Sequence, residues 1–292
     1  PLTVIEAIKS RLGIGSLLKD TLYFDLFNLS FDKSEDIISN ITFDSIDIHE
    51  KLSKCKALII GTGGLGSPIA FILAKSGLGT IGLVDFDHVE ISNLNRQVLH
   101  STSRIGMLKV ESAKQTLNNL YPDVNILIYP ETFSSGNSLE LVNSFDIVID
   151  GLDNFPTRYL LNDSCYFADK TLIEAGVLSF FGQTTTIVPN NTACLRCIFP
   201  ESTIPTHIPS CSETGVLGPV PGLIGTIEAI QAIKYILGIG LSTAGRFLMY
   251  NALEASFTVI DVERNNLCAL CGKNPEIKDI KDYTFVCEDK KS

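Results

Sequence analysis

The sequence from Gly61 to Arg96, GTGGLGSPIAFILAKSGLGTIGLVDFDHVEISNLNR, decides the fold of this chain. It follows KALII (56–60), a short apolar run rich in β-branched residues that is typical of a buried parallel strand. Its first six residues match G-x-G-x-x-G at Gly61, Gly63 and Gly66. Glycine permits the tight turn and lets backbone N–H groups approach a phosphate. The opening therefore predicts a phosphate-binding loop.

A helix and a second strand follow the loop in the order that nucleotide-binding folds use. Residues 67–76 predict a helix that ends at Gly77, and its positive N-terminus would face the phosphate. Residues 80–85 predict a strand that ends at Asp85, about 20 residues after the loop, where a carboxylate can accept hydrogen bonds from ribose hydroxyls. A plain strand–turn–helix is the alternative, but the complete order of elements favours a nucleotide site.

The composition describes a well-buried globular protein rather than a nucleic-acid-binding or membrane protein. The chain has 292 residues, of which 45% are apolar, and its net charge of −10 disfavours general binding to nucleic acid or to an anionic membrane. The longest apolar stretch (222–240) contains Glu228, Gln231 and Lys234 at three-residue spacing, so we interpret it as an amphipathic helix of a soluble protein. Eight cysteines and no visible secretory signal indicate metal binding in a reducing, cytoplasmic compartment.

Strand and helix patterns alternate after an N-terminal appendage at residues 1–50, which we expect to be helical or mixed. Within the main domain at 51–292, strands are predicted at 56–60, 80–85, 124–129, 146–150 and 171–175, and helices at 67–76, 107–119 and 156–167. This order predicts an α/β fold with a doubly wound, mostly parallel, Rossmann-like sheet. Later strands at 182–189, 247–252 and 256–262, with a helix at 222–238 among them, extend it and are expected to be antiparallel. Residues 200–209 predict an exposed crossing loop.

Two C-x-x-C knuckles, Cys194–Cys197 and Cys268–Cys271, lie far apart in the sequence. Together they can supply a tetrahedral shell of four thiolates with no open position, which is typical of structural zinc. A redox pair or a chance spacing is the alternative. We interpret Cys55, Cys165 and Cys287 as buried or incidental thiols.

Polar and cationic residues beyond Asp85 indicate a ligand with more charge than a dinucleotide. Asn93, Arg96 and Lys109 follow on a predicted loop and helix, and Asp153 follows a predicted strand, where ligands bind in open α/β sheets. A triphosphate attacked at its α-phosphate requires cations and a metal ion, and Asp153 could hold Mg²⁺. Alternatively, Lys109 is a solvated helix residue and Asp153 a helix N-cap before Pro156.

The chain resembles the ThiF/MoeB/HesA family of ubiquitin-activating-like adenylyltransferases. The resemblance covers residues 52–287 and rests on the motifs GTGGLGSP, LVDFDHVEISNLNRQVLH, GMLKVESA, DGLDNFPTRY, CLRC, CSETGVLGPVPGLIGTIEAIQAIKYILG and CALCG. It implies a cytoplasmic homodimer that uses ATP, Mg²⁺ and Zn²⁺. Its implied partner is a ubiquitin-like sulfur carrier for thiamin, molybdopterin or another pathway, whose C-terminal Gly-Gly carboxylate is adenylated with release of pyrophosphate.

The resemblance also implies roles for particular residues. Arg96, Lys109 and Asp153 would be catalytic, Asp153 through Mg²⁺, and the four knuckle cysteines would bind zinc. The nucleotide would contact Gly61, Gly63, Gly64, Gly66, Asp85, Asp87, Asn93, Asn95, Arg96, Gln97, Lys109, Leu152 and Asp153. Cys211 occupies the position where some relatives link a cysteine to the carrier, whereas adenylation-only relatives resemble this sequence without needing the thiol.

One departure from the family concerns an Arg-Tyr-x-Arg-Gln motif that usually precedes the first strand and reaches the ATP of a neighbouring protomer. Residues 31–51 contain no arginine, so Arg11 or Lys51 would have to substitute, or the site is completed differently. Alternatives are adenylation of a ribosomal peptide, for which some relatives use an N-terminal appendage, or of a tRNA-bound carboxylate, or a non-catalytic binding module. An NAD-dependent oxidoreductase is disfavoured because no histidine lies in a proton-transfer context.

Overall fold

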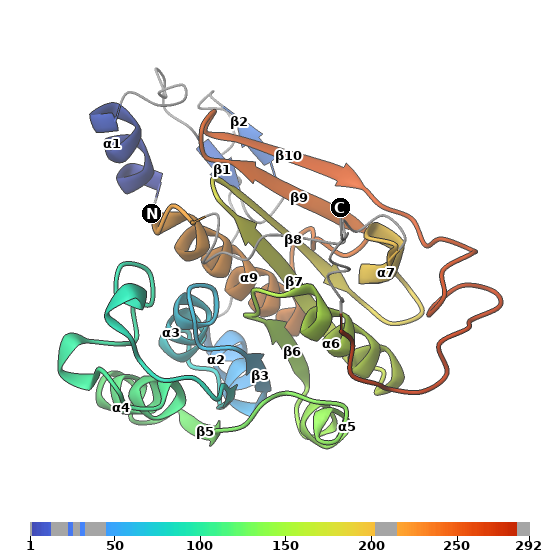
Figure 1. The fold of residues 1–292 in the computed structure, drawn as a ribbon, viewed down its shortest axis with the longest axis horizontal. Coiled ribbons are helices and arrows are strands. Elements are labelled where there is room, and N and C mark those ends of the chain that lie inside the picture. Colours follow the sequence, from blue (N-terminus) through green and yellow to red (C-terminus); the bar gives the residue numbers. More distant parts are fainter. Residues whose placement is uncertain (1, 13–22, 26–29, 33–44, 202–214, 285–292) are drawn as a thin grey trace, which may run out of the picture.

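The computed structural model describes residues 2–12, 23–25, 30–32, 45–201 and 215–284. Within these ranges, an eight-stranded sheet forms the centre of the molecule (Figure 1). The predictions for Cys211, for Cys287 and for most of the loop at 200–209 lie outside the described residues.

The central sheet has the strand order β10-β9-β8-β7-β6-β3-β4-β5. Its strands are β3 (Lys56–Ile60), β4 (Thr80–Val84), β5 (Asn125–Tyr129), β6 (Ile147–Asp150), β7 (Thr171–Leu178), β8 (Phe181–Ile187), β9 (Arg246–Asn251) and β10 (Ser256–Asp261). The pairs among β3 to β7 are parallel, whereas β7–β8, β8–β9 and β9–β10 are antiparallel. The fold class and the antiparallel extension predicted from the sequence are therefore confirmed.

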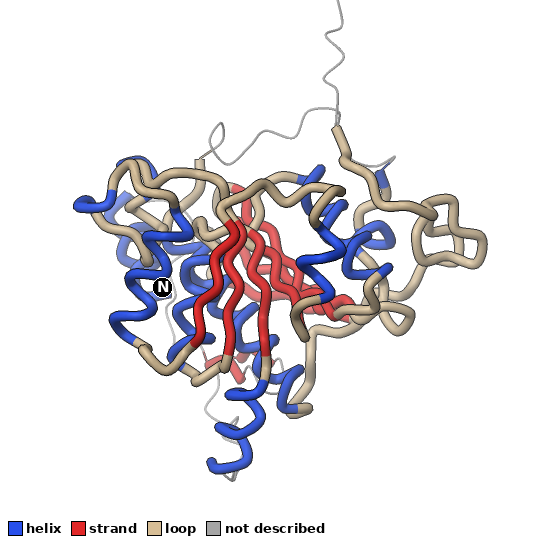
Figure 2. The backbone as a smooth tube through the Cα atoms, turned by 90° about the horizontal axis from the view of Figure 1, so that it is seen from below, coloured by secondary structure: helices blue, strands red, loops and turns tan. Residues whose placement is uncertain are grey.

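Helices cover both faces of the sheet (Figure 2). One hydrophobic cluster contains residues from α1 (Leu2–Leu12), α2 (Ser45–Lys54), α3 (Gly66–Lys75), α4 (Lys109–Leu120) and α9 (Pro219–Leu237). The other contains residues from α5 (Ser138–Asn143), α6 (Phe155–Phe167) and α7 (Leu195–Ile198), together with three of the knuckle cysteines. The remaining described elements are the hairpin β1 (Tyr23–Asp25) and β2 (Ser30–Asp32) and the 3₁₀ turns η1 (Ile91–Asn93) and η2 (Thr102–Arg104).

The strand register brings three loops together at one edge of the sheet. Ile60, the last residue of β3, pairs with Val84 of β4 on one side and with Asp150 of β6 on the other. The chain runs from β3 to β4 and β5, then returns to β6 on the opposite side of β3. Such a reversal leaves a crevice outside the carboxyl ends of the strands, which is where open α/β sheets bind ligands.

Helix α9 corrects the interpretation of the apolar stretch as an amphipathic helix. Glu228, Gln231 and Lys234 are buried rather than solvated. Gln231 accepts a hydrogen bond from the N–H of Thr243, and Lys234 donates to the carbonyl of Leu241, so both fix the turn that follows the helix. Burial raises the pKa of Glu228 well above its ordinary value, which favours the neutral acid.

Length and composition alone would allow α9 to cross a membrane, but 67% of its most apolar window is buried inside the protein. This burial is typical of a core helix.

The N-terminal helix α1 packs on α9. Ile5 and Lys9 are buried, and Lys9 forms an ion pair of 2.7 Å with Glu6. Ile5 joins the larger hydrophobic cluster of the main domain. A domain boundary at residue 50 stays a prediction.

Two glycines let the backbones of the converging loops approach closely. Gly61 has a φ of +92°, and a Cβ there would lie 2.6 Å from the carbonyl oxygen of Gly151. A Cβ on Gly66 would lie 1.9 Å from the carbonyl oxygen of Gly61. Glycine is therefore required sterically at both positions.

We expect Gly66→Ala to lower the free energy of unfolding by about 3 kcal/mol, because overpacking against backbone outweighs the helix propensity of alanine. Gly136→Ala is the control, since its Cβ would approach nothing closer than 3.7 Å. Urea denaturation measures both. Equal stability of the two variants would contradict the steric explanation.

Candidate active site

A cleft of about 220 Å³ lies at the sheet edge where β3, β4 and β6 end. Ten of the predicted nucleotide-site residues line it: Gly61, Gly63, Gly64, Asp85, Asp87, Arg96, Gln97, Lys109, Leu152 and Asp153. Glu131, Phe133, Val177, Val216 and Pro221 are among its other walls. Segments spread over more than 150 residues of sequence therefore meet around one cavity.

The glycine loop and the acidic end of β4 are joined directly. The N–H and the hydroxyl of Thr62 both donate to Oδ2 of Asp85, at 2.8 Å each. The N–H of Asp87 donates to the other carboxylate oxygen at 2.9 Å. A carboxylate accepts about four hydrogen bonds, so Asp85 keeps capacity for one further donor on the cleft side.

Two cationic side chains lie on the cleft. Lys109, the first residue of α4, is buried and forms a 2.8 Å ion pair with Asp87, so it is not the solvated residue of the alternative interpretation. Arg96 is half-buried, and its Nη1 donates to the carbonyl of Ser92 and to the side chain of Asn95. Its Nε and Nη2 donors remain for a ligand.

The segment after β6 presents Asp153 on the cleft. Asn154, rather than Asp153, caps α6 by accepting from the N–H of Thr157 at 3.0 Å, so the N-cap interpretation of Asp153 is wrong. Buried Asp150 accepts from the N–H of Leu152 and forms an ion pair with Arg158 at 3.4 Å. Burial raises the pKa of Asp150 to about 6, and Arg158 opposes the rise.

Three of the predicted nucleotide ligands lie off the cleft walls. Gly66 starts α3 behind the loop, where its role is the close backbone contact described above. Asn93 accepts from the N–H of Glu90 and closes η1, and Asn95 supports Arg96. Arg11 and Lys51, the suggested substitutes for the family arginine, are exposed on α1 and α2 and do not line the cleft.

His100 is a buried residue of the site that no sequence pattern singled out, and it lies behind the glycine loop. One ring nitrogen lies 3.1 Å from the carbonyl oxygen of Thr62 and the other 3.0 Å from Oγ of Ser112. Burial, with a smaller contribution from Lys109, lowers the pKa of His100 to about 4. His100 is the last residue of the RQVLH motif, but only the tertiary structure shows that its ring lies beneath the glycine loop.

A second cleft of about 400 Å³ adjoins the first and shares Leu152, Asp153 and Val177 with it. Its walls are mainly apolar, with Phe155, Leu178, Phe181, Phe199 and Met249, and its polar residues include Arg158, Gln183, Asn251 and Glu254. The guanidinium of Arg158 lies against Gly176, where a Cβ would come within 2.9 Å of Nη1. An extended chain in this cleft would end at Asp153.

The four knuckle cysteines meet in one cluster, and none of them lines either cleft. All four sulfurs lie within 4.8 Å of one another, and the Cys194–Cys268 and Cys197–Cys271 sulfurs are 3.6 and 3.3 Å apart. Zn–S bonds of about 2.3 Å in a tetrahedron place sulfurs about 3.8 Å apart, so this donor set fits zinc. The N–H of Asn265 also donates to Sγ of Cys197.

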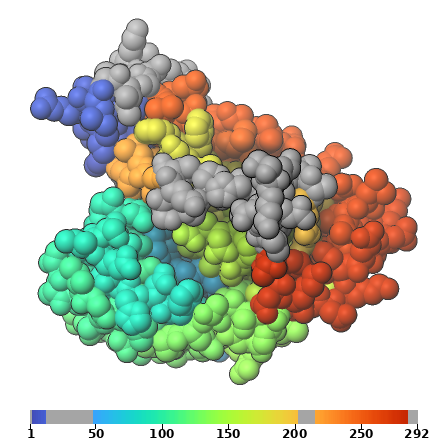
Figure 3. Space-filling model, in the orientation of Figure 1, coloured from blue at the N-terminus to red at the C-terminus, as the bar shows by residue number. Residues whose placement is uncertain are grey.

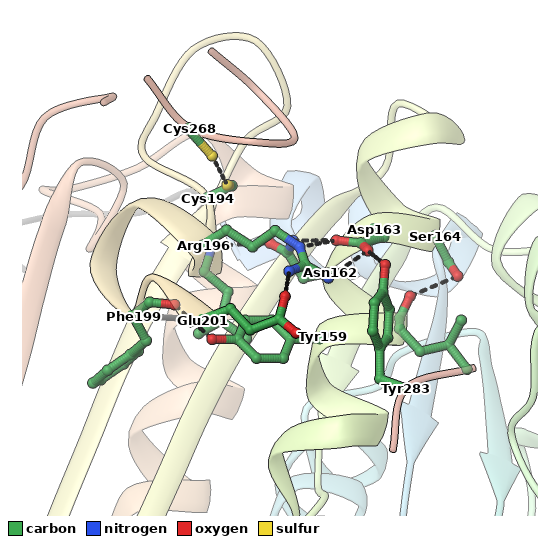
Figure 4. Close-up of polar contacts among 12 residues, drawn as sticks. Tyr159, Asn162, Asp163, Ser164, Cys194, Arg196, Phe199, Glu201, Cys268 and Tyr283 are labelled. Atoms are coloured by element: carbon green, nitrogen blue, oxygen red, sulfur yellow. Dashed lines mark hydrogen bonds and ion pairs between the residues drawn. The ribbon is translucent and has the colours of Figure 1, made fainter. Parts of the chain in front are cut away.

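Arg196, inside the first knuckle, fixes the cysteine cluster to α6 (Figure 4). Its Nε and Nη2 donate to the two oxygens of Asp163 at 2.9 Å, and its guanidinium lies over the rings of both Tyr159 and Tyr283. The neighbouring Asn162 accepts from the N–H of Leu195. One helix face therefore holds two consecutive residues of the knuckle.

The C-terminal segment completes this cluster. The hydroxyl of Tyr283 donates to Asp163 at 2.5 Å, and Asp282 accepts from both the N–H and the hydroxyl of Ser135. In Figure 3 the last described residues (red) accordingly lie against the green surface around α5.

Comparison with known proteins gives a family match over most of the chain. The model described as "ThiF family" matches residues 37–270. The chain is 40% identical over 244 residues to the sulfur carrier protein adenylyltransferase of Thermus thermophilus, covering 82% of this chain and 90% of that protein. It is 42% identical over 238 residues to the adenylyltransferase and sulfurtransferase MOCS3 of Xenopus laevis, covering 81% of this chain. The chain spans about half of that relative, 53%.

Among solved structures, the fold is similar to that of E. coli MccB crystallised with ATP. The TM-score is 0.68 at 26% sequence identity, and the match covers 77% of this chain and 69% of that chain.

We expect Arg196→Ala to lower the free energy of unfolding by about 3–5 kcal/mol, because it leaves the buried carboxylate of Asp163 without its cation. Lys281→Ala is the control, since this exposed ammonium lies over the same Tyr283 ring and should cost less than about 1 kcal/mol. Denaturant titration gives both values, and comparable losses would contradict the role given to Arg196.

We expect the stability that depends on His100 to fall as the pH drops from 6.5 to about 4. The folded state keeps the ring neutral in this window while the unfolded state binds the proton, and the shift corresponds to about 3 kcal/mol. Urea denaturation at several pH values should therefore give a shallower acid slope for His100→Gln than for the unmutated protein. Identical slopes would contradict the prediction.

Proposed function

The chain belongs to the ThiF family, and from this premise we propose how it activates a carboxylate with ATP. It is an adenylyltransferase, as the Thermus and Xenopus relatives are by name, and its substrate is a ubiquitin-like sulfur carrier. The name of the Thermus relative, which mentions a sulfur carrier protein, supports this choice of substrate. The observation that carries the proposal is the charged cleft at the carboxyl edge of the sheet. It combines the glycine loop, a ribose-side carboxylate and two cations around one cavity.

The charges that line the cleft favour a triphosphate bound with a metal ion. Asp85, Asp87, Glu131 and Asp153 are its acids, and Arg96 and Lys109 are its cations. Two cations against four acids cannot neutralise a triphosphate, so a divalent cation is required. Exposed Asp153 is a suitable ligand, because Mg²⁺ is usually held by one or two carboxylates together with substrate phosphates.

We assign the residues of the cleft to particular parts of ATP. Backbone N–H groups of Gly63 and Gly64 would bind phosphate oxygens, and Asp85 would accept one hydrogen bond from the ribose. Lys109 and Arg96 would stabilise the charge that develops when a carboxylate oxygen of the carrier attacks the α-phosphorus. The new bond is a mixed anhydride between that carboxylate and AMP, and the bond between the α-phosphorus and the bridging oxygen breaks to release pyrophosphate.

The second cleft would receive the C-terminal tail of the carrier. It meets the first cleft at Asp153, so a tail lying along it would bring its terminal carboxylate to the α-phosphate. The apolar walls suit an extended segment whose last residues have small side chains, as in a Gly-Gly ending. Positioning of this kind can lower the barrier by converting a bimolecular step into an effectively unimolecular one.

Zinc would occupy the four-cysteine cluster and act structurally. The four donors leave no open position for chemistry. Through Arg196 and Asn162 the cluster would order α6, and Asp153 directly precedes the N-cap of this helix. The metal would therefore support the cleft from a distance.

Four further features remain proposals: Gly-Gly recognition, a cytoplasmic location, a homodimer and covalent use of Cys211. A second protomer has the same sequence, and residues 31–51 contain no arginine, so it could bring a cation to the acidic cleft only through a substitute such as Arg11 or Lys51. Adenylation of a peptide is the second candidate, because the described fold resembles MccB and the chain carries additional N-terminal elements.

ATP–pyrophosphate exchange tests the function. We expect a Gly-Gly-ended carrier to stimulate exchange, and Asp153→Asn to lower the rate at least about 100-fold by removing the metal carboxylate. Asp123→Asn, an exposed residue between α4 and β5, is the control and should change the rate less than twofold. Exchange stimulated only by short peptides would contradict the carrier assignment, and an active Asp153→Asn would contradict the metal assignment.

Mass spectrometry of the same reactions, quenched during turnover, tests Cys211. A thiol-sensitive adduct between enzyme and carrier is the expected product if the cysteine is used covalently. Adenylated carrier without any adduct would place this enzyme among those that only adenylate.

Metal analysis should find one zinc per chain. We expect Cys268→Ser to lose the metal and several kcal/mol of stability, because zinc binding contributes directly to folding free energy. Cys55→Ser, which removes a thiol outside the cluster, should retain both. Full zinc occupancy in Cys268→Ser would contradict the assignment.

A further inference from the structure

His100 is a buried group that the proposed chemistry does not use. It is 8% exposed and lies between η1 and η2, after the segment that carries Arg96. Its ring contacts two segments that contribute other residues to the cleft, through the carbonyl of Thr62 in the glycine loop and the hydroxyl of Ser112 in α4. It therefore bridges two segments that contribute separately to the cleft.

The partners fix the protonation state of the ring. The carbonyl oxygen of Thr62 can only accept, so Nε2 of His100 carries the hydrogen. Nδ1 then accepts from the hydroxyl of Ser112, and both nitrogens of the neutral ring are satisfied. The charges around it agree, since Lys109 and Arg104 oppose a positive ring more than Asp85 favours one.

The two bridged segments, the glycine loop and the first turn of α4, are the ones to which we assign binding of the phosphates. Thr62 is flanked by Gly61 and Gly63, and its N–H and hydroxyl fix Asp85. Ser112 lies one helical turn after Lys109, so the ring ties the loop to the turn of α4 that carries the ammonium. Arg104 donates to the carbonyl of Ser112 and braces the same turn.

We propose that His100 is a positioning residue for ATP, which holds the glycine loop and the Lys109 turn of α4 at the separation at which both bind one triphosphate. This inference rests on the proposed function. It predicts a selective effect. Loss of the His100 ring weakens binding of a ligand that contacts both the glycine loop and Lys109 more than binding of a ligand that carries one phosphate.

Nucleotide binding measured by titration calorimetry, without any carrier, tests the inference. We expect His100→Ala to weaken ATP binding at least tenfold and AMP binding less than threefold. The amide nitrogen of His100→Gln can take the place of Nε2 and donate to Thr62, so this variant should recover most of the affinity. His100→Asn can replace only Nδ1 and should not.

Thr186→Val is the matched control for a general loss of stability. Thr186, in β8, is fully buried, and its hydroxyl forms a hydrogen bond with the hydroxyl of Thr243. It lines neither cleft, so its replacement should leave the ratio of ATP to AMP affinity unchanged. Equal weakening of ATP and AMP in His100→Ala, or equal rescue by Asn and Gln, would overturn the positioning role. An unmutated protein that does not bind ATP contradicts the proposed function itself and this inference with it, whereas ATP binding without carrier adenylation contradicts only the carrier assignment.

Discussion

Two hydrogen bonds from Thr62 to a single carboxylate oxygen of Asp85 hold the nucleotide cleft together. They join the loop after β3 to the end of β4, so the segments to which we assign the phosphate and the ribose form one unit. The glycines make this possible, because any side chain at Gly66 would overlap the backbone of Gly61. The cleft is therefore preorganised by backbone contacts before a ligand arrives, which lowers the cost of binding a highly charged substrate.

Helix α6 connects the segment around Asp153 to the cysteine cluster. Asn154 and Asp150 fix the segment around Asp153 at one end, while Asn162 and Asp163 hold the first cysteine knuckle further along. Asp163 and Arg196 are both buried, and such a pair specifies geometry more reliably than it adds stability. Through this arrangement, a metal ion at the four cysteines would support the phosphate site that we propose at Asp153.

The sequence predicted the features that depend on local pattern and spacing. The strands from 56 to 175, the glycine loop and the paired knuckles follow from local pattern and spacing, and the structure agrees with them. Tertiary contacts decided the rest. The three-residue spacing of Glu228, Gln231 and Lys234 could not reveal that all three are buried, Gln231 and Lys234 against the following turn. Likewise, His100 has no local signal, because its partners Thr62 and Ser112 are distant in sequence.

The central claim is that one cleft binds a triphosphate between the glycine loop, Lys109 and Asp153. A crystal structure of the protein with Mg²⁺ and a non-hydrolysable ATP analogue tests it most directly. We expect the phosphates to lie against Gly63, Gly64 and Lys109, with the metal bound to the carboxylate of Asp153. An analogue bound elsewhere, or bound in this cleft with its phosphates directed away from Lys109 and Asp153, would contradict the account.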